Sequence, residues 1–191
     1  MQKSLVLGGI LGGVVLFVWG TISWMVLPWH LMTLEKFTDE IAVAQVLTAN
    51  AGQPGVYILP NAHKQDPSLP EAVRKAAEED AMNRAQLGPF VFASIAPRGW
   101  GSMGSAMGIG LLNQIAAALL ATWLLLNTKG LSYLARVRFL VMLALAVAVI
   151  AHVPYWNWWH FSTSYTLVAF TDLLIGWFLA GLVIAKLTPT P

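Results

Sequence analysis

Four runs of predominantly apolar residues divide the chain, at positions 4–27, 106–126, 139–155 and 165–187. A helix needs about 20 such residues to cross the ~30 Å hydrocarbon core of a bilayer, and each run is close to that length. The third run is the shortest and ends in PYWNWWHF, an aromatic sequence typical of the interface between lipid and water. The pattern predicts a mainly α-helical, polytopic protein with four transmembrane helices.

The segment between the first two runs has the pattern of a water-exposed chain. Apolar residues recur at helical spacing from Leu34 to Leu47 and predict a helix that stops near positions 50–52. GVYILP and PFVFASIA are predicted strands. Between them, Ser68 is the expected capping residue of a second helix, with Glu71 completing the capping box. The order is helix, strand, helix, strand, and the last three elements predict a parallel βαβ unit.

A sheet of two strands is marginal in water, so this segment needs the membrane surface, its own first helix or a second chain to cover its apolar face. No catalytic signature is found in it. Because its edges and apolar face are uncovered, we expect the segment to be unstable or self-associating when it is expressed alone.

The charges of the short connections predict the orientation of the chain. Lys129, Arg136 and Arg138 lie in the brief link between the second and third runs, which places that link and both termini in the cytoplasm. Loops longer than ~60 residues cross a membrane regardless of charge, so the long insertion is expected outside. The domain organisation is therefore residues 1–29 as an uncleaved first transmembrane helix, 30–101 as a small extracytoplasmic α/β domain and 102–191 as helices two to four.

The amino-acid composition limits the class of protein, the kinds of site it can contain and its expected partners. The chain has 57% hydrophobic and 10% charged residues, whereas soluble domains carry near 25% charged residues. It contains no cysteine, which excludes disulfides, thiolate metal sites and cysteine nucleophiles. The few basic residues are scattered and form no patch, so nucleic acid is not an expected partner. The expected surroundings are the lipid bilayer and other membrane proteins.

Asp172 is the only acidic residue in the second half of the chain, and it lies within the fourth apolar run. An ionisable group in a transmembrane helix costs at least ~2.5 kcal/mol and must therefore face protein or water. Counted from predicted cytoplasmic ends at positions 127, 138 and 186, three polar residues lie fourteen positions into the membrane: Asn113, His152 and Asp172. Gln114 is adjacent to this intramembrane polar layer.

Two interpretations of this layer remain open from the sequence. If Asp172 and His152 form a pair, its protonation can change near neutral pH, and it could relay protons or hydrogen-bond a quinone or another amphiphile. The alternative is a polar clasp that holds three helices together. A metal site is a third hypothesis, because His30, His152 and His160 all fall toward the outer face, although none has the i, i+4 spacing of a strong motif.

Small residues recur four apart in three of the four apolar runs. They are Gly8, Gly9, Gly12 and Gly13 in the first, Gly104 and Gly108 in or beside the second, and Gly176 and Ala180 in the fourth. Such spacing allows helix backbones to approach closely in lipid. The contacts could lie within this chain or between subunits, and the sequence favours neither.

The blocks WGTISWMVLPWH, GVYILP, GPFVFASI and PYWNWWHFSTSYT resemble those of small bacterial four-helix inner-membrane proteins to which no activity is assigned. The resemblance covers nearly the whole chain. It implies a bacterial inner-membrane location and brings no catalytic residue or cofactor with it.

Together these patterns favour a non-enzymatic function, as an accessory or scaffolding subunit of a larger bacterial inner-membrane assembly or as a homo-oligomer. The alternative hypothesis is a small carrier or redox-associated membrane protein that uses Asp172 and His152 on protons, a quinone or a metal. The identity of any cofactor is not predicted.

Overall fold

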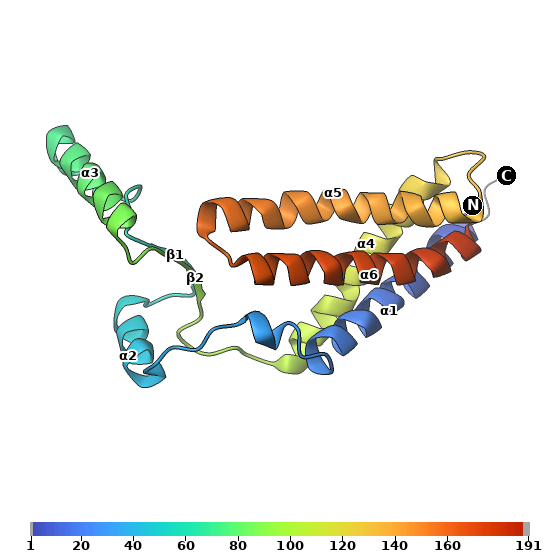
Figure 1. Cartoon of the computed structure of the whole chain (residues 1–191), viewed down its shortest axis with the longest axis horizontal. Coiled ribbons are helices and arrows are strands. Elements are labelled where there is room, and N and C mark those ends of the chain that lie inside the picture. The colour runs from blue at the N-terminus through green and yellow to red at the C-terminus, as the bar shows by residue number, and fades with distance from the viewer. Residues whose placement is uncertain (1, 189–191) are drawn as a thin grey trace. The chain divides into compact units, whose positions relative to one another are not determined.

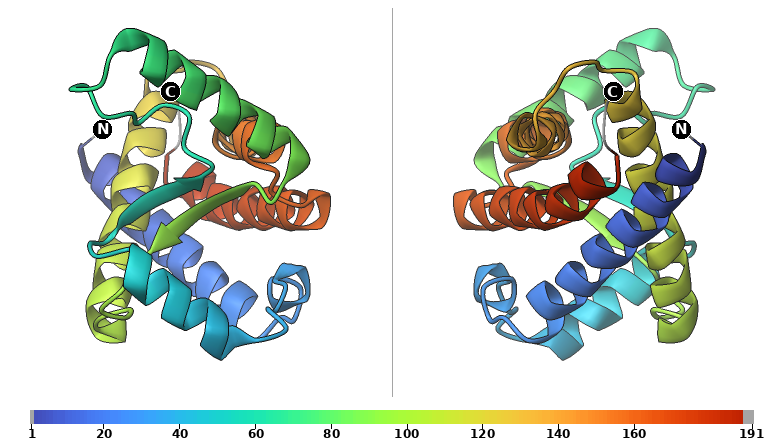
Figure 2. Two further views of the ribbon diagram at one scale, coloured as in Figure 1. Left: turned by 90° about the vertical axis from the view of Figure 1, so that its left-hand side faces the viewer. Right: turned by 90° about the vertical axis from the view of Figure 1, so that its right-hand side faces the viewer.

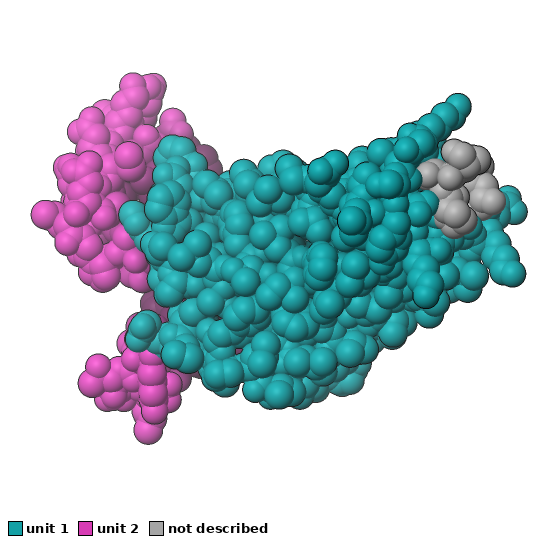
Figure 3. Space-filling view, turned by 45° about the vertical axis from the view of Figure 1, so that its right-hand side comes forward, with its two compact units in different colours: residues 1–35, 102–191 teal, residues 36–101 magenta. Residues whose placement is uncertain are grey.

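We analysed a computed structural model of the chain, which describes residues 2–188. The fold is mainly helical, and it divides into two compact units, coloured separately in Figure 3. Unit 1 comprises Met1–Glu35 and Ser102–Pro191, and unit 2 comprises Lys36–Gly101.

Unit 1 is built from four long helices: α1 (Gln2–Met25), α4 (Met103–Leu126), α5 (Tyr133–Trp159) and α6 (Thr163–Leu187) (Figure 1). All four are long and apolar enough to cross a membrane, which confirms the number of long apolar helices predicted from the sequence. The bounds of the third helix differ most from the prediction. This helix, α5, has 27 residues and extends beyond both ends of the predicted 139–155 run. Pro154 lies within its last turns, and the helix ends at His160, which has a left-handed backbone with φ of 57°.

The four helices pack as two neighbouring pairs, α1 with α4 and α5 with α6, and α1 also packs against α6 (Figure 2). Small residues of α1 bring it close to both neighbours. A Cβ added at Gly13 would lie 2.5 Å from the Cα of Ile115 on α4, and one at Gly12 would lie 2.6 Å from a methyl of Ile184 on α6. By contrast, α4 and α5 contact one another at few positions, so one side of α4 has no helical neighbour among the described residues of unit 1.

Unit 2 contains α2 (Glu40–Asn50), β1 (Gly55–Leu59), α3 (Glu71–Leu87) and β2 (Val91–Ile95), in the predicted order. The predicted parallel βαβ unit is wrong. The strands pair antiparallel, with Gly55 opposite Ile95 and Leu59 opposite Val91. The segment that contains α3 therefore returns the chain to the end of β1 at which β1 finished. It is a long connection between the two strands of an antiparallel hairpin.

Two helix starts in unit 2 also differ from the prediction. The first helix begins at Glu40 because the Asp39 carboxylate caps it, accepting a hydrogen bond from the Ala42 N–H at 2.9 Å. Apolar spacing alone extended this helix back to Leu34. Ser68 does not cap α3, because its hydroxyl donates to the Asp66 carboxylate at 2.8 Å and Pro70 precedes the helix without a side-chain cap.

Unit 2 has very few buried apolar side chains. Its buried apolar residues in the described chain are three alanines, Ala51, Ala62 and Ala81. Large apolar residues on all four elements stay exposed, including Ile41 at 74% and Leu87 at 86%. The main hydrophobic core belongs to unit 1, where Leu125, Leu140 and Ile184 are fully buried.

Candidate functional site

The segment that follows α1 folds back against the end of this helix and places His30 beside its last turn. Pro28 cannot continue the helix, and the chain turns into a short 3-10 helix at Leu31–Thr33. The turn is closed by the Thr33 hydroxyl, which donates to the His30 carbonyl at 2.7 Å. His30 is only 3% exposed as a result, although it lies outside the long helix.

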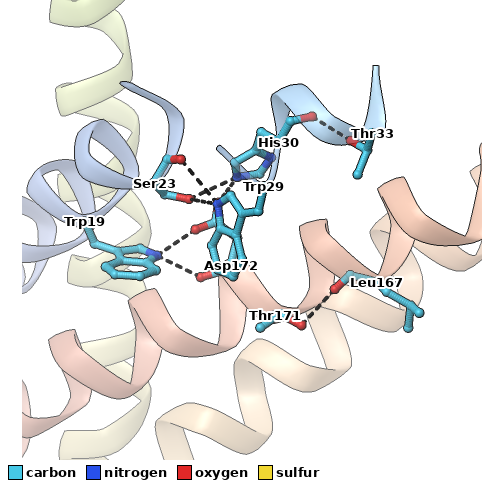
Figure 4. Close-up of polar contacts among 8 residues, drawn as sticks. All are labelled: Trp19, Ser23, Trp29, His30, Thr33, Leu167, Thr171 and Asp172. Carbon is cyan, nitrogen blue, oxygen red and sulfur yellow. Dashed lines mark hydrogen bonds and ion pairs between the residues drawn. The ribbon is translucent and has the colours of Figure 1, made fainter. Parts of the chain in front are cut away.

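His30 meets Asp172 of α6 (Figure 4). Its Nε2 atom lies 3.3 Å from Asp172 Oδ2, and the two side chains are 4% and 17% exposed. The same Nε2 atom lies 3.0 Å from the hydroxyl of Ser23, which is fully buried. Ser23 and His30, seven positions apart, thus share one small polar region with Asp172 of α6.

Two tryptophans complete the hydrogen bonding of this region. The Trp19 indole N–H donates to Asp172 Oδ1 at 2.7 Å and to the Asp172 carbonyl at 3.0 Å. The Trp29 indole N–H donates to the Ser23 hydroxyl at 2.9 Å and to the Ser23 carbonyl at 3.2 Å. Both carboxylate oxygens and the serine hydroxyl therefore have partners, which is what burial of polar groups requires.

Aromatic rings surround the imidazole. Trp24 stacks on His30 with ring centroids 3.9 Å apart and an interplanar angle of 10°, and Trp29 meets it edge-on at 5.6 Å. Trp29 also packs edge-on against Trp19 at 6.2 Å. These rings exclude water and hold the imidazole in one orientation. We call these six residues the Asp172 cluster: Trp19, Ser23, Trp24, Trp29, His30 and Asp172.

Asp172 and Ser23 contact the same imidazole nitrogen, Nε2 of His30. If the carboxylate is ionised it offers only lone pairs, and Nε2 then carries the hydrogen that points to it. A Ser-His-Asp hydrolase needs the serine on one ring nitrogen and the aspartate on the other. Here both partners contact Nε2 and the serine is inaccessible, so the cluster cannot activate Ser23 as a nucleophile.

The predicted pair of Asp172 with His152 is not formed. The His152 ring packs against Phe170, with centroids 5.8 Å apart, and makes no hydrogen bond to another described residue. It lines a cleft of about 230 Å³ between α5 and α6, with Tyr155, Phe161, Tyr165 and other residues. Equal depth along two helices does not bring side chains together, because they can point to different sides.

The remaining members of the predicted layer also lie apart from Asp172. Asn113 and Gln114 line a groove of about 420 Å³ between α4 and α5, with Trp177 of α6 also in its wall. Neither amide makes a hydrogen bond within residues 2–188. The four predicted polar residues therefore lie in three separate places.

The three histidines of the metal hypothesis are not gathered into a site. His30 belongs to the Asp172 cluster, whereas His152 lines the cleft and His160 ends α5. Within the described chain no group of three or more His, Cys, Asp or Glu side chains is arranged to hold a metal ion.

The small residues divide into two sets. Those of α1 and α6 are buried against neighbouring helices, as at Gly9 against Leu119 and Gly176 against Trp19. Ala180 is fully buried. Gly104 and Gly108 of α4 are exposed, and nothing lies within 4 Å of a Cβ placed at Gly108.

The sequence pattern identifies Asp172 but not its partners. It places His30 at the start of the extracytoplasmic segment and among the metal candidates, and it places Trp19 and Ser23 only within the first transmembrane helix. The available signal was the i, i+4 spacing of Trp19 and Ser23, which puts two hydrogen-bonding side chains on one face of α1.

Comparison of the chain with protein-family models, with curated proteins and with solved structures gives no match in any of the three. The geometry of the Asp172 cluster and the surfaces of the four long helices are therefore the basis for assigning a function.

Proposed function

We propose that this chain is a polytopic bacterial inner-membrane protein that acts as a non-enzymatic accessory or scaffolding subunit. Four long apolar helices support the membrane location. The basic residues between α4 and α5 favour a topology with both termini in the cytoplasm and residues 30–101 outside. In this topology the Asp172 cluster lies toward the outer side of the membrane.

The observation that carries the proposal is the hydrogen bonding within the Asp172 cluster. Both carboxylate oxygens of Asp172, Nε2 of His30 and the Ser23 hydroxyl bond to one another or to indole N–H groups, and Trp24 and Trp29 pack on the imidazole. These groups are therefore already engaged with one another. A network of this kind supplies a fixed connection between two parts of a protein.

The contact between His30 and Asp172 lies close to the point where the chain enters unit 2. Through His30, the last residues of unit 1 before Lys36 are tied to Asp172 in the middle of α6. The contact between His30 and Asp172 therefore fixes the position from which the chain leaves unit 1. Exposed apolar side chains on unit 2, such as Ile41 and Leu87, provide a surface suited to covering by another chain.

Topology is tested first. Reporter fusions after residues 64 and 130 should lie on opposite sides of the membrane, with residue 64 outside. A result with both reporters on the same side contradicts the proposed topology and with it the extracytoplasmic role of unit 2.

The scaffolding role is tested by purifying the tagged chain from native membranes in a mild detergent. We expect other protein chains at fixed stoichiometry and no pigment or bound metal. The Asp172→Asn variant removes the charge but keeps an acceptor for Trp19, so it should retain those chains. Asp172→Leu, which leaves His30 and Trp19 without a partner, should release them. If the chain instead purifies without other protein chains and with bound quinone or metal, the proposal is contradicted.

One observation favours a second candidate function, that of a quinone-linked or redox-associated carrier. His152 lines the α5–α6 cleft with an imidazole that makes no hydrogen bond to a described residue, beside the aromatic rings of Tyr165 and Phe161. Imidazole and phenol groups can donate to a quinone carbonyl. Quinone retained by the wild-type protein and lost in His152→Ala, but unaffected in Asp172→Asn, would favour this function over scaffolding.

A further inference from the structure

One face of α4 is exposed along its whole length. Its residues are separated by steps of three and four positions, the spacing of a seam between two helices that pack at a small angle. They are Ala106, Ile109, Asn113, Ala116, Leu120 and Trp123. Every one is exposed in the chain, with Ile109 and Leu120 each at 66% and Trp123 at 54%. We call this set the α4 seam.

Asn113 lies in the middle of the α4 seam and has no partner. Its amide makes no hydrogen bond within residues 2–188, and it is more than two turns from either end of the helix. An amide that faces hydrocarbon without a hydrogen bond is strongly unfavourable, because nothing replaces its hydrogen bonds to water. The exposed α6 residue Thr171 avoids this cost, because its hydroxyl donates to the Leu167 carbonyl (Figure 4).

We infer that the α4 seam is a homodimer interface, in which Asn113 hydrogen-bonds to Asn113 of a second copy. All copies of a membrane protein have the same orientation, so two of them are related by a twofold axis along the membrane normal. Such an axis places a seam residue opposite itself. The asparagine amide carries both a donor and an acceptor, and two of them can form reciprocal hydrogen bonds. A single asparagine in an apolar seam fixes register and oligomeric state in this way.

Exposed apolar side chains also occur on α1 and α5, as at Val18 and Ile150, but the α4 seam is distinguished by the amide of Asn113, which has no partner among the described residues. The small residues of α1 are already used inside the chain, because Gly9 and Gly13 pack against Leu119 and Ile115. Contacts between α4 and α5 are few, so a second α4 can approach α4 without displacing a helix of its own chain. This inference deepens the proposed function and rests on its membrane location, since it names a second copy as one partner of the scaffold.

The absence of native cysteine makes a direct test available. Single cysteines introduced along α4 should form disulfide-linked dimers in native membranes after mild oxidation, with maxima at positions 109, 116 and 120. Ile150→Cys on α5 and Leu167→Cys on α6 are matched controls, because the wild-type residues are 76% and 60% exposed and lie outside the seam. Cross-linking in these two controls measures random collision.

Asn113 is tested in the Ala116→Cys background. Asn113→Gln keeps an amide and should preserve dimerisation, whereas Asn113→Leu should weaken the dimer about 3- to 30-fold, the range expected for interhelical polar contacts in membranes. Protein found in the membrane fraction with no periodic cross-linking, or with equal cross-linking in the controls, overturns this inference and leaves the proposed function intact. Equal dimerisation of Asn113→Leu and wild type also overturns it. Protein absent from the membrane fraction overturns the proposed function itself.

Discussion

The Asp172→Ala substitution is the sharpest test of the Asp172 cluster. It removes the acceptor of the Trp19 indole and the carboxylate beside His30, whose side chain is 4% exposed. Two groups then lose a hydrogen-bond partner, and each such loss in a buried site costs about 1–3 kcal/mol. Asp172 itself is 17% exposed, so water can partly fill the gap, and we expect a total of about 3 kcal/mol. An ordinary interhelical hydrogen bond in a membrane contributes only ~0.6 kcal/mol.

A double-mutant cycle identifies the partner. Asp172→Ala combined with His30→Ala should show a coupling free energy of at least ~1 kcal/mol, because each single substitution removes the same contact. The matched control is Asp172→Ala combined with His152→Ala. These two side chains do not meet, so their effects should add to within ~0.5 kcal/mol. The two cycles differ only in which histidine is removed.

The free energy of unfolding can be measured in mixtures of a mild detergent and sodium dodecyl sulfate, followed by tryptophan fluorescence. Trp19, Trp24 and Trp29, three of the nine tryptophans of the chain, belong to the cluster and contribute to this signal. Asp172→Asn should lose only about 1 kcal/mol, since the amide oxygen still accepts from Trp19. Additive effects of Asp172 and His30, or stronger coupling to His152, would refute the arrangement described here.

Three further predictions concern other parts of the chain. Gly13→Ala should destabilise unit 1 by about 1–3 kcal/mol in the same unfolding assay, because its Cβ would meet the Ile115 backbone. Gly20→Ala, with nothing within 4 Å of its Cβ, should be neutral or stabilising, and equal losses in both would contradict close α1–α4 packing. Hydrogen bonds from the Ser68 backbone N–H and hydroxyl lower the pKa of Asp66 below its ordinary value of 3.8. The turn should therefore persist above pH 3.8 and weaken as the pH falls through the lowered pKa, and in an NMR titration Ser68→Ala should move the midpoint up toward 3.8. Residues 36–101 expressed alone should be unstable or self-associate, because their buried apolar residues are three alanines; a monomer with a cooperative thermal transition would contradict this.

Local pattern along the chain was sufficient to predict the four long helices and the order of the elements between them. About 20 successive apolar residues have few alternatives to a long helix, since all backbone hydrogen bonds must be satisfied within the segment. The same pattern identified Asp172, because a charge in such a run needs a specific partner. Each of these features depends on residues close together in the chain, which is why no knowledge of the fold was needed.

Which residues meet, by contrast, depends on how the elements pack. Counting residues along a helix predicts the depth of a side chain but not the direction in which it points, so the equal counts for Asn113, His152 and Asp172 do not bring these side chains to one site. The partner of Asp172 is His30, because the chain turns at Pro28 and folds back over the end of α1. The direction of β2 was likewise set by where α3 returns the chain, since strand pairing depends on the path between the strands and not on the strands' own residues.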